Sequence, residues 1–193
     1  MITINEKTDD TLSFSVDNIA MANSIRIAMI SQVEILAINK IYIETNTSNL
    51  CDEILSHRLG LLVVNSRHID TVDAGPEDES VYFSLDVICD EDEMFVTPSM
   101  FKCSNELVTP VNSNTPIIKL FRGQSLRLIC IINRGTGTTH AKWISMILSK
   151  YSIDGDTVSM SIETVGSLDS LDILQIALKK LKEKLQNLLL AIS

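Results

Sequence analysis

Two pairs of neighbouring polar residues carry side chains that are able to do acid–base chemistry. His57 stands beside Arg58, and His140 stands two residues before Lys142, so each pair offers a general base next to a cation that could hold an anion. Neither pair has a nucleophile at a spacing that would complete a catalytic site. We therefore interpret His57 and Arg58 as contacts to another protein, with a structural role as the first alternative and catalysis as the second.

Two other segments suggest chemistry but fit simpler interpretations. Residues 135–139, GTGTT, could cradle a phosphate, yet they lack the Gly-Lys-Ser/Thr ending of a P-loop, and a mobile turn explains them. The acidic run at residues 90–93 lacks the alternating ligand spacing and the glycine of an EF-hand loop, so we interpret it as a solvated face.

The composition is that of a folded protein that stays inside the cell. The 193 residues are 45% hydrophobic and 21% charged, with a formal net charge of −9, and this acidity argues against a primary nucleic-acid-binding surface. No apolar run suits a membrane span, and no signal pattern is evident. The cysteines form no C-x-x-C pair, so we expect free thiols, no zinc and no cofactor. They are Cys51, Cys89, Cys103 and Cys130.

The first 32 residues predict a strand followed by a helix. Apolar and polar residues alternate from Leu12 to Val16, which is the period of a strand with one buried face. Asp17 or Asn18 can cap a helix expected from about residue 19 to residue 32, with Arg26 away from its apolar side. The predicted apolar ridge of this helix consists of Met21, Ile25, Ala28 and Met29.

A strand, a turn and a short helix are expected next. Residues 35–44 are rich in isoleucine and predict a strand, and residues 46–49, NTSN, are of types that hydrogen-bond their own backbone in turns. The following helix is expected to stop at Gly60. It has acidic residues in its first turn and basic residues near its end, as the helix dipole favours: Asp52, Glu53, His57 and Arg58.

The middle of the chain predicts several strands and two loops. Alternation predicts strands at residues 81–87, 125–133, 144–153 and 157–165, with Leu126, Leu128, Cys130 and Ile132 on one face of the second. Polar residues at 65–80, with a Gly75-Pro76 turn, and three prolines within 98–116 predict loops. His140, Lys142 and Trp143 are expected at an alternating strand entry, with Trp143 as an anchor in a protein interface.

A long amphipathic helix is predicted from about residue 169 to residue 191. Its large apolar residues recur at alternating spacings of three and four, which forms a heptad seam. These residues are Leu171, Leu174, Leu178, Leu181, Leu185, Leu188 and Ile192. An ordinary core stripe is one interpretation of this seam. We favour the other, a surface that docks a helix of another chain, because the phase of the seam is unbroken.

Three blocks of sequence resemble the assembly platform of cellular RNA polymerases. In chain order they are ANSIR (22–26) through NTSN (46–49) to DEIxxHRLGL (52–61), then GQSLRL (123–128) with GTGTTHAKW (135–143), then ETVGSL (163–168) before the long helix. The family contains the bacterial alpha subunit, the archaeal D subunit and the third-largest subunit of eukaryotic RNA polymerase II. The resemblance is strongest to the archaeal and eukaryotic members.

The resemblance implies an α+β fold with a discontinuous dimerisation domain, a sheet plus two packing helices, at residues 1–50 and 149–193. A β-rich domain is expected to be inserted at residues 51–148. It also implies a non-catalytic assembly subunit that forms a heterodimer with a smaller alpha-like subunit. The residues expected in that interface are Met21, Ile25, Arg26, Met29, Leu171, Leu174, Leu178, Leu181, Leu185 and Leu188.

Two other kinds of partner are implied by the resemblance, namely the second-largest catalytic subunit and small zinc-binding subunits, without sequence-specific contact to nucleic acid. The residues expected to face them are Asn46, Thr47, Asp52, Glu53, His57, Arg58, His140, Lys142 and Trp143. The alternative from another functional class is a homodimeric scaffold or regulator, unrelated to transcription, that uses the same helical seam.

Three features depart from the family pattern. Ile27 follows Arg26 where the family usually has a second basic residue, so one polar contact of the docking helix is expected to be missing. Val63-Val64 and Ile144-Ser145 stand where prolines are usual, and the cysteine cluster of many members is absent. A reduced member encoded by a large DNA virus fits this composition. The nucleus, a cytoplasmic viral factory and the virion are not distinguished.

Overall fold

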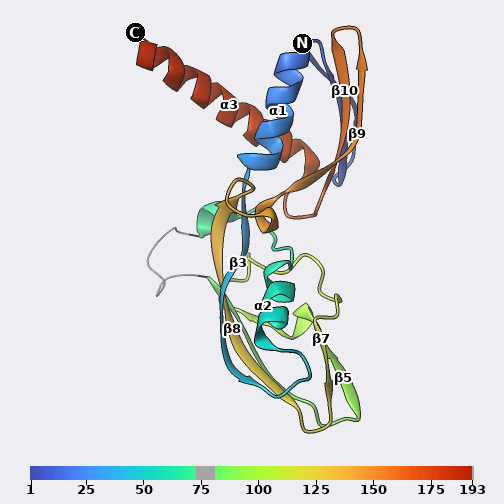
Figure 1. Ribbon diagram of the computed structural model, residues 1–193, viewed down its shortest axis with the longest axis vertical. Coiled ribbons are helices and arrows are strands. Elements are labelled where there is room, and N and C mark those ends of the chain that lie inside the picture. The colour runs from blue at the N-terminus through green and yellow to red at the C-terminus, as the bar shows by residue number, and fades with distance from the viewer. Residues whose placement is uncertain (73–80, 193) are drawn as a thin grey trace. The chain divides into compact units, whose positions relative to one another are not determined.

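The computed structural model describes residues 1–72 and 81–192, and within them it is an α+β fold with three α-helices (Figure 1). The predicted α+β class is confirmed, while the predicted Gly75-Pro76 turn lies outside the described residues. The chain divides into two compact units: the first comprises residues 1–35 and 135–193, and the second residues 36–134. The boundaries after residues 50 and 148 stay a prediction from the family resemblance.

The first unit is a four-stranded antiparallel sheet with two helices. Its elements are β1 (Ile2–Lys7), β2 (Thr11–Val16), α1 (Ile19–Ser31), β9 (Met146–Asp154), β10 (Thr157–Thr164) and α3 (Ser170–Ile192). The strand order is β1-β2-β10-β9. Phe14 of β2 lies opposite Met160 of β10, and both side chains are buried. The register therefore gathers the apolar residues of the central strands on one face.

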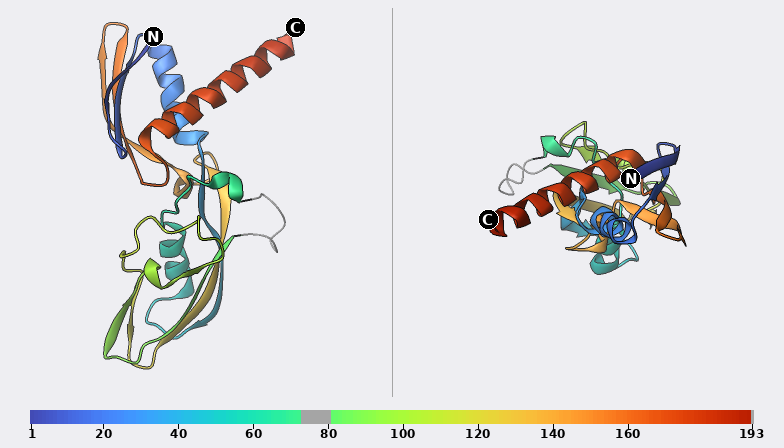
Figure 2. Two further views of the ribbon diagram at one scale, coloured as in Figure 1. Left: turned by 180° about the vertical axis from the view of Figure 1, so that it is seen from behind. Right: turned by 90° about the horizontal axis from the view of Figure 1, so that it is seen from above.

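Both helices of the first unit lie on the same side of this sheet, as two opposite views show (Figures 1 and 2). Ile25 and Met29 of α1, and Ile173 and Leu174 of α3, are at most 3% exposed. Burial of side chains of this size stabilises each by about 1.5–3 kcal/mol relative to an exposed position. The sheet, α1 and the first half of α3 thus form the core of the unit.

Local hydrogen bonds fix both ends of α1. The side chain of Asn18 accepts a hydrogen bond from the backbone N–H of Met21 at 2.8 Å, which confirms Asn18 as the N-terminal cap. At the other end, the hydroxyl of Thr138 donates to the carbonyl of Ser31 at 2.7 Å. The turn that contains Thr138 therefore satisfies a carbonyl that the helix itself leaves unpaired.

The second unit is built from two sheets and one α-helix. Its elements are most of β3 (Glu34–Asn46), α2 (Asp52–Gly60), β4 (Tyr82–Ile88), β5 (Glu93–Val96), β6 (Lys102–Cys103), β7 (Ile118–Phe121) and most of β8 (Ser125–Thr136). One sheet has the order β3-β8-β4-β6, and β5 pairs with β7 in the other. Leu55 and Leu59 of α2 are fully buried in the same core as Phe83 of β4. The four predicted inward residues of β8 are also buried there.

Several elements differ from the sequence expectations. Strands β1, β5 and β7 were not predicted, and β6 lies inside the expected loop at residues 98–116. β1 is an edge strand, mostly exposed, so it lacks the alternation that identifies a half-buried strand. Gly60 is the last residue of α2, and its φ is not positive, so it does not end the helix by the left-handed conformation expected of a stop glycine.

Candidate docking surfaces

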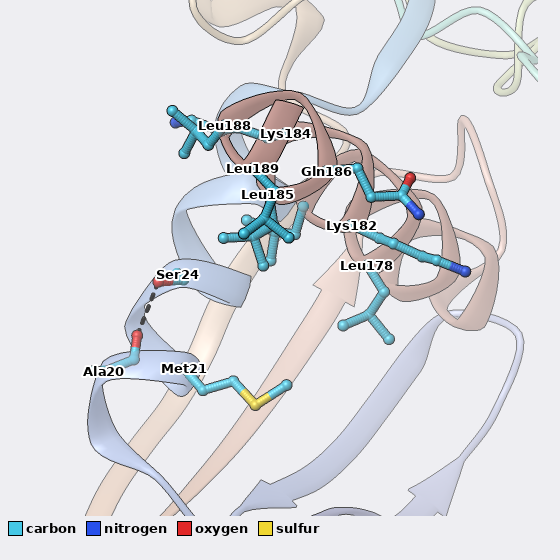
Figure 3. Close-up of a pocket in the computed structure, with 11 residues that line it drawn as sticks. Ala20, Met21, Ser24, Leu178, Lys182, Lys184, Leu185, Gln186, Leu188 and Leu189 are labelled. Atoms are coloured by element: carbon cyan, nitrogen blue, oxygen red, sulfur yellow. Dashed lines mark hydrogen bonds between the residues drawn. The ribbon is translucent and has the colours of Figure 1, made fainter. Parts of the chain in front are cut away.

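An apolar groove lies between α1 and the second half of α3 (Figure 3). Its volume is about 640 Å³. Leucines of α3 form one wall, and the exposed side of the first turns of α1 forms the other. We call it the α1–α3 groove, and its lining residues are Ala20, Met21, Ser24, Leu178, Leu181, Lys182, Lys184, Leu185, Gln186, Leu188 and Leu189.

The second half of α3 is uncovered by the rest of the first unit. The exposed fractions of Leu185, Leu188 and Leu189 are 61%, 51% and 70%. The helix continues past α1 and past the sheet in the two opposite views (Figure 1 and the left panel of Figure 2). Its first residue is held firmly, because the hydroxyl of Ser170 donates to the carbonyl of Thr8 at 2.8 Å. The result is a helix that is anchored at one end and presents an apolar face at the other.

The structure divides the predicted heterodimer residues into two groups. Ile25, Met29 and Leu174 are buried within the first unit, so their assignment as partner contacts is corrected: they form the core that supports the surface. The other members are exposed or half-buried, and most of them line the α1–α3 groove. These are Met21, Arg26, Leu171, Leu178, Leu181, Leu185 and Leu188.

Two details of α1 differ from the expected apolar ridge. Met21 was placed on the ridge, but it is 46% exposed and faces the groove, while Ala22 takes the buried position. Arg26 donates a hydrogen bond to the side chain of Asn23 at 2.8 Å, one turn earlier on the same helix. Six lining residues were absent from the predicted set, although they lie on the same two helices as its members: Ala20, Ser24, Lys182, Lys184, Gln186 and Leu189.

The polar side chains of the turn that leads into α2 form hydrogen bonds within the second unit. Asn46 donates hydrogen bonds to the carbonyl of Leu50 at 2.9 Å and to the carboxylate of Asp52 at 2.7 Å, and its side-chain oxygen accepts from Ser48. The hydroxyl of Thr47 accepts from the N–H of Ser125 at 2.7 Å. Asn46 and Thr47 therefore shape the turn that leads into α2, as well as lying in the predicted contact region.

The exposed side of α2 combines charge with two apolar residues. Glu53, His57 and Arg58 are exposed, and Arg58 donates to the carbonyl of Pro116 at 3.0 Å. Ile54 and Leu61, which were not predicted as site residues, are 50% and 51% exposed. Their spacing of seven places both on the same side of the helix as Arg58.

The segment around Trp143 is packed more tightly than the sequence suggested. Residues Ala141–Trp143 form a 3-10 turn rather than a strand entry, and Trp143 is only 5% exposed. A Cβ on Gly135 would lie 2.3 Å from the Trp143 ring, and one on Gly137 would lie 2.1 Å from the carbonyl oxygen of Ile30. The predicted turn is present at residues 137–139, where the glycines permit close packing, and Trp143 is a core residue rather than an exposed anchor.

His140 and Lys142 serve this same turn. His140 Nδ1 accepts a hydrogen bond from the backbone N–H of Lys142 at 3.1 Å, and Lys142 Nζ lies 4.3 Å from the centroid of the Trp143 ring. Partial burial lowers the pKa of the Lys142 ammonium group, because desolvation disfavours its charged form. Lys142 therefore makes a cation–π contact with Trp143, while His140 accepts a hydrogen bond within the turn.

The two histidines singled out by the sequence have no catalytic partner among the described residues. Within residues 1–72 and 81–192, no serine, cysteine or carboxylate is hydrogen-bonded to the ring of His57 or His140. No group of three or more His, Cys, Asp or Glu side chains in the same residues is placed to hold a metal ion. None of the described helices combines the length and the apolar character that a membrane crossing needs.

Comparison with known proteins gives the chain its family. Residues 33–150 match the RNA polymerase Rpb3/RpoA insert domain. The DNA-directed RNA polymerase subunit Rpo3 of Methanocaldococcus jannaschii is 36% identical over 98% of this chain and 96% of that protein. The DNA-directed RNA polymerase II subunit rpb3 of Dictyostelium discoideum is also 36% identical, over 77% of this chain.

The third relative is subunit 3 of the DNA-directed RNA polymerases II, IV and V of Arabidopsis thaliana, which is 31% identical over 90% of this chain. The matched part spans 56% of the Dictyostelium protein and 64% of the Arabidopsis protein. The family match covers more than half of the chain, and the archaeal match covers nearly all of both proteins. The chain therefore belongs to the Rpb3/RpoA family of RNA polymerase subunits.

Proposed function

We propose that this chain is a non-catalytic assembly subunit of a multisubunit DNA-directed RNA polymerase. The names of its archaeal and eukaryotic relatives support this function. The nucleotidyl transfer chemistry belongs to other subunits, and the role of this chain is to hold them in position.

The observation that carries the proposal is the exposed apolar half of α3 beside the α1–α3 groove. A soluble monomer rarely leaves a contiguous apolar patch of this kind uncovered. A permanent partner is the simplest cover, and an obligate interface buries more than about 2,000 Å² and is more apolar than ordinary surface. Leu185, Leu188 and Leu189 provide that character on one helix.

The proposed occupant of the groove is a smaller alpha-like subunit, which forms a heterodimer with the first unit. Its contacts are the exposed and half-buried residues of the groove, while Ile25, Met29 and Leu174 support them from below. The first unit is thus the dimerisation domain of the proposal. The second unit corresponds to the inserted β-rich domain.

The other partners are assigned to the polar surfaces. The exposed side of α2, with Asp52, Glu53, His57 and Arg58, is proposed to contact the second-largest catalytic subunit and small zinc-binding subunits, together with His140 and Lys142. Ile54 and Leu61 add apolar area to the α2 side. The mixture of charged and apolar groups is typical of the rim and centre of a protein interface.

The experiment isolates a tagged chain from its native source and identifies the proteins that accompany it. Replacement of both Leu185 and Leu188 with Asp puts two carboxylates into the proposed interface, so we expect the small partner to be lost completely from the purified complex. The matched control is Leu190→Asp. Leu190 is 75% exposed on the same helix but does not line the groove, so we expect this variant to retain the partner.

Two results would contradict the proposal. One is the recovery of the same polymerase subunits with the double variant as with the unchanged chain. The other is a lone recombinant chain that forms a stable homodimer while no polymerase subunit accompanies the native protein, which would support the alternative of a scaffold unrelated to transcription.

A further inference from the structure

Two lysines flank the exposed leucines of α3. Leu178, Leu181, Leu185 and Leu188 occupy the a and d positions of a heptad, and we call them the α3 ridge. In that frame Lys182 takes position e and Lys184 takes position g, one on each side of the ridge. Both are exposed, and both line the α1–α3 groove (Figure 3). Positions e and g are those at which charge decides which helices pair.

The positive charge of these flanks has no counterpart within the described residues. Neither Lys182 nor Lys184 forms an ion pair with any carboxylate in residues 1–72 or 81–192. The charge also opposes the trend of the chain: α3 contains four lysines and two carboxylates, whereas the whole sequence has 25 Asp and Glu against 16 Lys and Arg. Basic residues are thus concentrated where the apolar surface is open.

A second copy of the chain would meet this arrangement unfavourably. In a symmetric pair, the same patch serves as both halves of the contact, so each ridge would carry its own two lysines into a groove that is already lined by two. Like charges brought together at the edge of an apolar contact repel, and the loss of water strengthens that repulsion. The flanks therefore oppose self-association through the α3 ridge.

We propose that Lys182 and Lys184 select a partner helix whose apolar ridge is flanked by acidic side chains, and that they reject a second copy of this chain. The inference rests on the proposed function, since it specifies the chemistry of the helix that fills the same groove. Leucine contacts supply the attraction that any apolar helix would share, and the lysines supply the discrimination.

The first test uses the chain itself as a partner of defined charge. In Lys182→Glu/Lys184→Glu the flanks become acidic, while the α3 ridge is unchanged and the helix propensity is nearly conserved. We expect an equimolar mixture of this variant with the unchanged chain to associate at least about tenfold more tightly than either protein alone, since several exposed ion pairs replace like-charge contacts. Sedimentation equilibrium measures this difference, and added salt should reduce it.

The matched control makes the same change of charge on the same helix but away from the groove. Lys179 and Lys180 occupy positions b and c and do not line it. A mixture of Lys179→Glu/Lys180→Glu with the unchanged chain is expected to associate no more tightly than the unchanged chain alone. Equal association of both mixtures, or no association of either, would overturn the inference.

The second test uses the native complex and separates this inference from the proposed function. We expect Lys182→Glu/Lys184→Glu to release the small partner at a lower salt concentration than Lys179→Glu/Lys180→Glu does. If both variants retain the partner equally, the α3 ridge docks a partner without selection by charge, and only the inference fails. If the unchanged chain brings no polymerase subunit with it, the proposed function fails.

Discussion

The C-terminal half of α3 and the turn-bound segments at residues 46–50 and 140–143 all contain predicted partner contacts, but they differ in how far the chain itself covers and pairs them. On α3, Leu185 and Leu188 are more than half exposed and touch little of their own unit. In the turn-bound segments, Asn46 makes hydrogen bonds to three neighbouring residues, and Trp143 is buried against Gly135. One region is open, whereas the other segments are completed by the chain itself.

This difference shows what each region can contribute to assembly. An apolar face left open gains free energy only when another chain covers it, so the α3 region suits a permanent contact. Segments whose polar groups are already paired gain less from a partner, because a new hydrogen bond must replace an existing one. They are suited to position charged groups such as Arg58 for a contact of lower affinity.

The largest effect is expected from a comparison of two leucines on α3. Leu174→Asp places a carboxylate in the core, where Leu174 is 3% exposed, and should lower the free energy of unfolding by roughly 4–5 kcal/mol or more. Leu188→Asp changes a side chain that is 51% exposed and should alter the unfolding free energy of the isolated chain by only about 0.5 kcal/mol. Urea unfolding followed by the fluorescence of Trp143, the only tryptophan, measures both.

An equal loss of stability in the two variants would contradict the difference between the two halves of α3, because the second half would then belong to the core. A measurement of partner binding completes the test. Leu188→Asp should weaken recovery of the partner although the variant is as well folded as the unchanged chain.

An intermediate effect is expected where a glycine allows close packing. Gly135→Ala would bring a Cβ within 2.3 Å of the Trp143 ring, and the required shift should cost roughly 2–3 kcal/mol of stability. The matched change is Gly60→Ala in α2. There the nearest atom is the carbonyl oxygen of Ile38 at 4.0 Å, so alanine should be neutral or stabilising by up to about 1 kcal/mol. Thermal unfolding followed by circular dichroism compares the variants, and tolerance of Gly135→Ala would show that Trp143 is loosely held.

Periodicity predicted the elements in which one face is buried along the whole length. The alternation in β2 and β8 identified their inward residues, and Asn18 identified the start of α1. Periodicity could not divide α3, since Leu174 and Leu188 are the same residue type in the same repeat. Only the presence or absence of a neighbouring surface distinguishes them.

Other features were not predicted from the sequence because their sequence signal has two physical meanings. Glycine marks either a turn or a close approach of two segments of the chain. Gly135 and Gly137 predicted a mobile turn, and the tight packing around them was not predicted. The short strands β5 and β7 bury few residues and have too little length for a period to appear. The exposed residues among the predicted contacts remain a prediction, because burial shows which surfaces are open and not what covers them.

The smallest effect is expected from the turn that leads into α2. Asn46→Ala removes hydrogen bonds to Leu50, Asp52 and Ser48 and should lower the unfolding free energy by about 1–2 kcal/mol, because Ser48 and Leu50 are only partly exposed to water. Asn114→Ala is the control, since the exposed Asn114 side chain makes no hydrogen bond with the described residues. Hydrogen exchange should become faster in α2 for the first variant alone. Unchanged exchange would mean that α2 holds its place without this turn, and that its surface is less self-contained than the comparison with α3 requires.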